Sequence, residues 1–131
     1  MIDYEGMVRD FHIKYDHYIS KGETPPIDVI YLRDRLIEEE AHEFSLASGM
    51  LRNDPKELFT NSKVLIADAL ADLLYVVFGA AIAYNIPIEA VFEEVHRSNM
   101  SKSRLKNEYG KTIKGPNYFP PDILGILRGE R

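Results

Sequence analysis

The chain has 131 residues, no cysteine and a formal net charge of −5. This length fits a single domain over residues 1–131, although a helical bundle of this size often completes its core by forming a homodimer or homotetramer. The lack of cysteine excludes disulfides and thiolate metal sites, and the acidic balance argues against a dedicated nucleic-acid-binding protein. The most apolar run, 73–84, is too short to span a bilayer, and no secretory pattern opens the chain, so we expect a cytoplasmic protein.

Apolar residues recur with helical spacing, whereas the alternation typical of strands is absent, so the sequence predicts an all-α fold. We expect helices at about 2–19, 28–50, 62–84 and 87–99, with a short turn of helix at 55–59. Gly49 should help to end the second helix, Ser62 should cap the third, and Pro87 should open the fourth. The first helix should turn these side chains inward: Tyr4, Met7, Val8, Phe11 and Tyr15.

Acidic residues interrupt the apolar faces of the second and third predicted helices. Glu39, Glu40 and Glu43 fall among apolar residues of 28–50. Asp68 and Asp72 are the only charged residues in 64–78, and their i, i+4 spacing puts both on one face. Because a short connection favours antiparallel neighbours, these two acidic segments should face each other.

Carboxylates in apolar surroundings normally neutralise, pair with a cation or bind a metal. A cluster with oxygen ligands alone suits Mg²⁺ or Mn²⁺ better than zinc. The sequence therefore predicts a metal site from Glu39, Glu40, Glu43, Asp68 and Asp72. The alternative is a solvated glutamate-rich helix face, with the two aspartates paired to Arg33 or Arg35.

The chain becomes basic after the fourth predicted helix. The segment 101–120, here called the basic arm, has five cations against the single acid Glu108: Lys102, Arg104, Lys106, Lys111 and Lys114. Asn99 and Lys102 continue the helical spacing of Val91 and Val95, which we expect to face inward, so they should point toward the bundle, where a phosphate on the metal would lie. The alternative is a solvated surface loop.

Several motifs resemble the all-α nucleoside triphosphate pyrophosphohydrolases, a superfamily that includes MazG-like enzymes, phosphoribosyl-ATP pyrophosphohydrolases and dimeric dUTPases. The run 36–44 contains Glu-Glu-x-x-Glu, and the third predicted helix contains Ala-Asp-Leu-Leu-Tyr. The segments 10–12, 96–102 and 110–121 resemble a phosphoribosyl-ATP pyrophosphohydrolase-like, MazG-like branch. The resemblance implies a four-helix-bundle-like MazG-type fold with a basic C-terminal arm, completed by oligomerisation.

The resemblance also implies a role for each matching residue. Glu40, Glu43 and Asp72 match metal ligands, and Asp68 takes the place of a glutamate that would fall on Ala69. The implied reaction is Mg²⁺-dependent cleavage between the α- and β-phosphates of a nucleoside triphosphate, with Glu39 as the base that takes a proton from the attacking water. The positions that we expect to bind the substrate are Asn99, Lys102, Lys111, Lys114 and Tyr118.

Two other classes of protein compete with this interpretation. Glu39-x-x-His42 and Glu93-x-x-His96 have the spacing found in di-iron carboxylate bundles, but the glutamates expected from two further helices are missing. A non-catalytic helical interaction module would leave all of the acids on the surface.

Overall fold

The computed structural model describes residues 1–54, 56 and 59–130, and it is all-α, as the sequence predicts. The helices in these ranges are α1 (Tyr4–Lys14), α2 (Ile27–Asn53), α3 (Phe59–Ala83), α4 (Ile88–Asn99) and α5 (Ile123–Leu127). The chain divides into two compact units, Met1–Asn85 and Ile86–Arg131, and each is described by itself. The chain length predicts a single domain, and this organisation stays a prediction.

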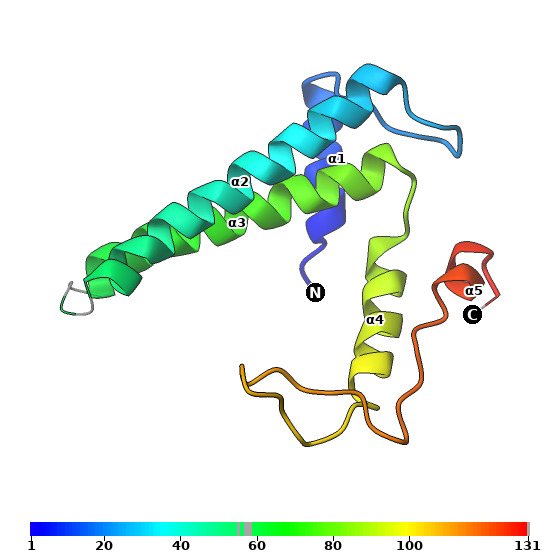
Figure 1. Ribbon diagram of the computed structural model, residues 1–131. Helices are drawn as coiled ribbons and strands as arrows, with labels where there is room; N and C mark the ends of the chain where they lie inside the picture. The colour runs from blue at the N-terminus through cyan, green and yellow to red at the C-terminus, as the bar shows by residue number, and fades with distance from the viewer. Residues whose placement is uncertain (55, 57–58, 131) are drawn as a thin grey trace. The chain divides into compact units, whose positions relative to one another are not determined.

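The first unit is built on a long antiparallel pair of helices, α2 and α3, with α1 packed against α3 (Figure 1). Small residues are buried along this pair, among them Ala47 of α2 and Ala69 and Gly79 of α3, so the two helices approach each other closely. The predicted antiparallel arrangement of these two helices is confirmed. The short turn of helix expected at 55–59 falls largely outside the described residues.

Helix α1 is shorter than the sequence predicts. It begins after Asp3, whose carboxylate accepts a hydrogen bond from the Gly6 N–H at 2.9 Å. It ends at Lys14 because Asp16 takes a left-handed conformation with φ of 56°, which stops the helix before the expected end near Ile19. The buried residues of α1 are Val8 and His12. The expectation was right for Val8. Tyr4 and Phe11 also turn toward α3, where they contact the Phe78 and Tyr75 rings, although both keep exposed surface. The expectation was wrong for Met7 and Tyr15, which are exposed.

Two predicted helix ends were wrong. Gly49 lies inside α2, which continues to Asn53, and the space that a Cβ would need at Gly49 is close to the Arg52 guanidinium. Ser62 lies inside α3 and is fully buried, and its Oγ has no hydrogen-bond partner among the described residues. Small side chains of this kind pack at a helix interface as readily as they end or cap a helix.

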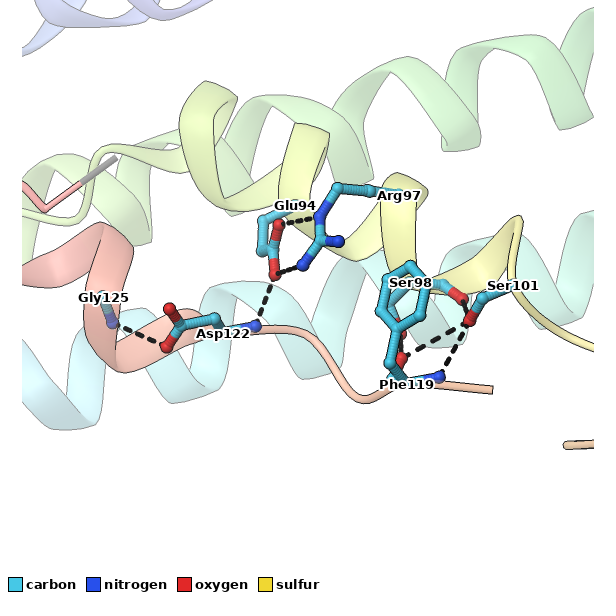
Figure 2. Close-up of polar contacts among 7 residues, drawn as sticks. All are labelled: Glu94, Arg97, Ser98, Ser101, Phe119, Asp122 and Gly125. Carbon is cyan, nitrogen blue, oxygen red and sulfur yellow. Dashed lines mark hydrogen bonds and ion pairs between the residues drawn. The ribbon is translucent and has the colours of Figure 1, made fainter. Parts of the chain in front are cut away.

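The second unit is held together by a buried glutamate on α4 (Figure 2). Glu94 is only 4% exposed, and its carboxylate accepts hydrogen bonds from Arg97 Nε at 2.7 Å, from Arg97 Nη2 at 2.9 Å and from the Asp122 N–H. Asp122 caps α5 by accepting from the Gly125 N–H at 3.0 Å. This network fixes the C-terminal segment along α4.

The buried face of α4 differs from the predicted one. Ser98, which is also buried, donates from its Oγ to the Phe119 carbonyl oxygen at 2.8 Å. Val95 is exposed, so the expectation that it faces inward was wrong. The polar residues Glu94 and Ser98 take the inward positions because the C-terminal segment offers them hydrogen-bond partners, which apolar periodicity does not reveal.

The basic arm contains a narrow turn. An isolated antiparallel bridge joins Lys106 and Thr112, and the Asn107 Oδ1 accepts from the Lys111 N–H at 2.9 Å. Gly110 adopts a positive φ of 80° in this turn, a conformation that glycine takes without strain. The arm is thus a hydrogen-bonded loop of the second unit.

The run 73–84 was expected to be too short to span a bilayer, but helix α3 as a whole is long and apolar enough to cross a membrane by length and composition. One such helix is weak evidence, because the core helix of a soluble protein passes the same test. Only 22% of its most apolar window is buried within the chain. Val64 and Leu74 are 68% and 58% exposed, which leaves an unpartnered apolar surface on α3.

Candidate metal and nucleotide site

Four of the predicted metal ligands line one cleft between α2 and α3. Glu40 and Glu43 come from α2, and Asp68 and Asp72 come from α3. The cleft has a volume of about 440 Å³. Because both pairs lie on facing sides of antiparallel helices, residues far apart in the sequence meet here. The remaining lining is apolar: Leu46, Ala47, Met50, Leu65 and Ala69.

The electrostatics of the cleft are those of carboxylates gathered without a cation. Burial raises the pKa of Glu40 from its ordinary value, and the negative charges of Asp72, Glu43, Glu39 and Asp68 raise this pKa further. No ion pair joins the four lining acids to a lysine, arginine or histidine in the described part of the chain. The predicted alternative, in which Asp68 and Asp72 pair with Arg33 or Arg35, is therefore not what these residues show.

The acids are more exposed than the sequence predicts. Asp68 and Asp72 are exposed on α3, because the apolar residues around them in the sequence are themselves largely exposed. As the side chains stand, no three acidic or histidine side chains among the described residues are arranged to hold a metal ion. The di-iron pattern likewise brings no such cluster together in residues 1–54, 56 and 59–130.

The chemistry of the lining residues nevertheless fits a divalent cation. All four charged groups are carboxylates, which are the ligands that Mg²⁺ and Mn²⁺ prefer, and all four lack a protein cation among the described residues. A bound cation would relieve the repulsion that raises the pKa of Glu40. The carboxylates of Glu43, Asp68 and Asp72 are exposed, and exposed side chains change rotamer readily.

Two details bear on individual ligands. Asp68 lies at the cleft, as does Ala69, the position where the superfamily pattern has glutamate. Glu39 is close enough to raise the pKa of Glu40, but it does not line the cleft. The position of Asp68 is therefore compatible with a role as the fourth metal ligand. The position of Glu39 is compatible with a carboxylate that does not bind the metal directly.

The predicted substrate-binding residues all belong to, or begin, the second unit's C-terminal segment. Asn99 is the last residue of α4 and is exposed, and Lys102 is half-buried in the turn that follows. The Lys102 N–H donates to the Asn99 carbonyl oxygen at 3.1 Å, which keeps these two residues adjacent. Lys114 Nζ lies 5.0 Å from the centre of the Tyr118 ring, and Lys111 is exposed in the turn of the basic arm.

The sequence was then compared with known protein families. The model of the phosphoribosyl-ATP pyrophosphohydrolase family matches residues 8–99. The chain belongs to this family. The match contains α2, α3 and the whole acidic cleft, and it ends at Asn99, so the basic arm lies beyond it. A comparison with curated proteins found no match.

Membership in the phosphoribosyl-ATP pyrophosphohydrolase family confirms the predicted superfamily and assigns a pyrophosphohydrolase activity class. It favours the enzyme over the di-iron bundle and the interaction module. Helical periodicity in the sequence already places Leu46 and Met50 on the same stripe of α2 as Glu39 and Glu43, and both line the apolar half of the cleft. No role in binding was predicted from the sequence for this apolar half.

The raised pKa of Glu40 predicts how the metal-free protein responds to pH. Because this carboxyl binds its proton more tightly in the folded protein than in the unfolded chain, protonation stabilises the fold. That stability is present below the pKa of the unfolded chain and is lost as the pH rises through the higher folded pKa. In chelator, the melting temperature of the parent should therefore fall as the pH rises above about 4.5, and this fall should be smaller in Glu40→Gln. Glu38→Gln, an exposed neighbour, should leave the decline unchanged; equal profiles for the parent and Glu40→Gln would contradict the repulsion.

Proposed function

We propose that this protein is a Mg²⁺- or Mn²⁺-dependent nucleotide pyrophosphohydrolase that converts a nucleoside triphosphate to the monophosphate and pyrophosphate. The observation that supports this most strongly is the cleft in which Glu40, Glu43, Asp68 and Asp72 meet without a cation among the described residues. The family match supports the same reaction class. Since nucleotides are cytoplasmic metabolites, we also propose a cytoplasmic enzyme.

The acids of the cleft have distinct tasks in this proposal. Glu40, Glu43, Asp68 and Asp72 would hold the metal, which supplies neutralisation of the phosphate charge and an oriented water. Glu39, beside the ligand set and outside the cleft lining, would take the proton from that water as it attacks the α-phosphorus. The P–O bond to the β-phosphate then breaks, and pyrophosphate leaves.

The C-terminal residues would contact the substrate and would not bind the metal. Lys102, Lys111 and Lys114 would contact phosphate oxygens as point charges, and Asn99 and Tyr118 would donate hydrogen bonds. The apolar half of the cleft, with Leu46 and Met50, would accommodate the less polar part of the nucleotide.

The products test the bond that is cleaved. Incubation with a panel of common and modified nucleoside triphosphates should give monophosphate and pyrophosphate with Mg²⁺ or Mn²⁺ and nothing with chelator, as measured by chromatography and a pyrophosphate assay. Orthophosphate and diphosphate as products would overturn the assigned bond. Failure on every nucleotide with ample metal would overturn the proposed substrate class.

We further propose that a second copy of the chain covers the exposed apolar face of α3, giving a homodimer or homotetramer. The exposed side chains on this helix, such as Val64 and Leu74, are more apolar surface than a stable monomer normally leaves to water. Light scattering after gel filtration should give a mass at least twice 15.0 kDa, and Leu74→Asp should shift it toward 15.0 kDa. A parent protein that stays at 15.0 kDa at high concentration would contradict the proposal.

A further inference from the structure

Three helices of the first unit meet at Gly79, and two buried polar side chains lie there. Arg33 of α2 is 4% exposed and His12 of α1 is 2% exposed. A Cβ at position 79 would lie 2.5 Å from Arg33 Nη1 and 3.2 Å from His12 Nε2. Glycine is therefore what lets the guanidinium and the imidazole rest against α3. Neither group lines the acidic cleft.

Arg33 is a buried cation without a partner. Its guanidinium makes no hydrogen bond or ion pair with any described residue, and its Nε is enclosed without an acceptor. The two terminal nitrogens of the Arg33 guanidinium also lack a partner, but unlike Nε they are not fully buried, so they keep some contact with solvent. Arginine does not escape burial by losing its proton, so an unpaired guanidinium here is costly unless an anion joins it.

His12 determines which kind of anion fits. Its Nδ1 lies 3.0 Å from the Tyr18 carbonyl oxygen, which only accepts, so Nδ1 carries a proton. Burial lowers the pKa of His12, and the charge of Arg33 acts in the same direction. The ring is therefore neutral near pH 7, and its Nε2 is a hydrogen-bond acceptor. An oxyanion that satisfies both residues must accept from the guanidinium and donate one O–H to Nε2.

Singly protonated phosphate, free or as a monoester, has both properties, whereas a carboxylate or sulfate has no proton to donate. We propose that Arg33 and His12, lying against Gly79, form a binding subsite for a singly protonated phosphoryl group. The subsite is distinct from the acidic cleft and does not depend on the proposed hydrolysis.

The subsite and the acidic cleft follow the same interface between α2 and α3. Glu40 follows Arg33 by two helical turns of α2, or about 10 Å, and Gly79 follows Asp72 by the same interval on α3. A phosphoryl group bound by Arg33 is thus either free phosphate or a second phosphate of a ligand whose other phosphates occupy the cleft.

Thermal unfolding with inorganic phosphate tests the subsite. In chelator at about pH 7.5, where inorganic phosphate is mainly singly protonated and His12 is neutral, saturating phosphate should raise the Tm of the parent by about 3 °C or more over sulfate at equal ionic strength. Arg33→Gln should lose this phosphate-specific rise. Arg35→Gln removes the same charge from an exposed position of α2 and should keep it. An equal rise in Arg33→Gln, no rise in the parent, or an equal rise with sulfate would overturn the subsite.

A second measurement serves if Arg33→Gln does not fold. The ¹⁵N resonances of the His12 ring in the parent should shift on titration with phosphate and stay fixed with sulfate, and fixed resonances with both would overturn the proposal. A non-hydrolysable nucleoside triphosphate analogue separates the two sources of the phosphoryl group. If the phosphoryl group belongs to a nucleotide, the analogue should shift the His12 resonances at a lower concentration than inorganic phosphate does. If the subsite takes free phosphate, the analogue should leave these resonances unchanged.

Discussion

Asp72→Asn and Glu43→Gln should each lose Mg²⁺ binding and lower kcat/KM by more than about 100-fold, because a direct ligand contributes more than the outer-shell groups that orient it. The two variants remove one charge from each of the helices that line the cleft. Calorimetry with Mg²⁺ and steady-state kinetics measure the two losses. Unchanged Mg²⁺ affinity in either variant would remove that residue from the proposed ligand set.

The same variants should keep the helical fold, and in chelator they should be at least as stable as the parent. Asp72 is the neighbouring charge that raises the pKa of Glu40 most, so Asp72→Asn relieves repulsion in the metal-free cleft. Glu38→Gln is the matched control: it makes the same chemical change on α2 at an exposed residue outside the cleft lining. It should alter neither metal binding nor activity. A loss of helical circular dichroism in Asp72→Asn would instead indicate a structural role for this aspartate.

The acidic cleft was predictable because it depends on simple periodicity. The i, i+4 spacing of Asp68 and Asp72, and the close spacing of Glu40 and Glu43, fix their faces on α3 and α2. A short connection then makes the helices antiparallel, and the acids meet. Local spacing and connection length thus suffice for a site that lies between two consecutive helices.

The burial of individual residues was less predictable because it depends on which surfaces meet. Asp68 and Asp72 lie in an apolar sequence yet are exposed, since their apolar neighbours on α3 also face away from this chain's core. On α4, Glu94 and Ser98 are buried through hydrogen bonds to the C-terminal segment. Asp122 and Phe119, the partners in this segment, lie more than twenty residues away along the chain and leave no periodic signal.

The partnerless Arg33 illustrates the same limit. From the sequence, Arg33 was a candidate ion-pair partner for the aspartates of α3. The structure instead places it against Gly79 and His12, without an acid among the described residues. The side chain of an arginine is long and flexible, so the guanidinium can meet residues on more than one turn of a neighbouring helix, and its position in the sequence does not fix its partner.

Lys102→Ala should weaken nucleotide binding or slow turnover, lowering kcat/KM by about 10- to 150-fold, while the Mg²⁺ affinity of the free protein stays nearly unchanged. The estimate corresponds to the loss of one charge-assisted hydrogen bond to phosphate, about 1.5–3 kcal/mol. Lys102 follows α4 and is half-buried, with its N–H bonded to the Asn99 carbonyl oxygen, so its main chain is held in place. The split between kcat/KM and metal affinity distinguishes a substrate contact from a metal ligand.

Arg104→Ala is the control for Lys102→Ala, because it removes a cation from an exposed position of the same basic arm. If the arm acted through its net charge alone, both variants would weaken activity equally and the effect would fade as salt screens the charge. A specific contact at Lys102 instead predicts a small effect of Arg104→Ala and a loss in Lys102→Ala that persists at high salt. If Lys102→Ala matched the parent in both kcat and KM, the arm would be a surface loop, and phosphate recognition would have to come from cations of the first unit, with Arg33 the first to test.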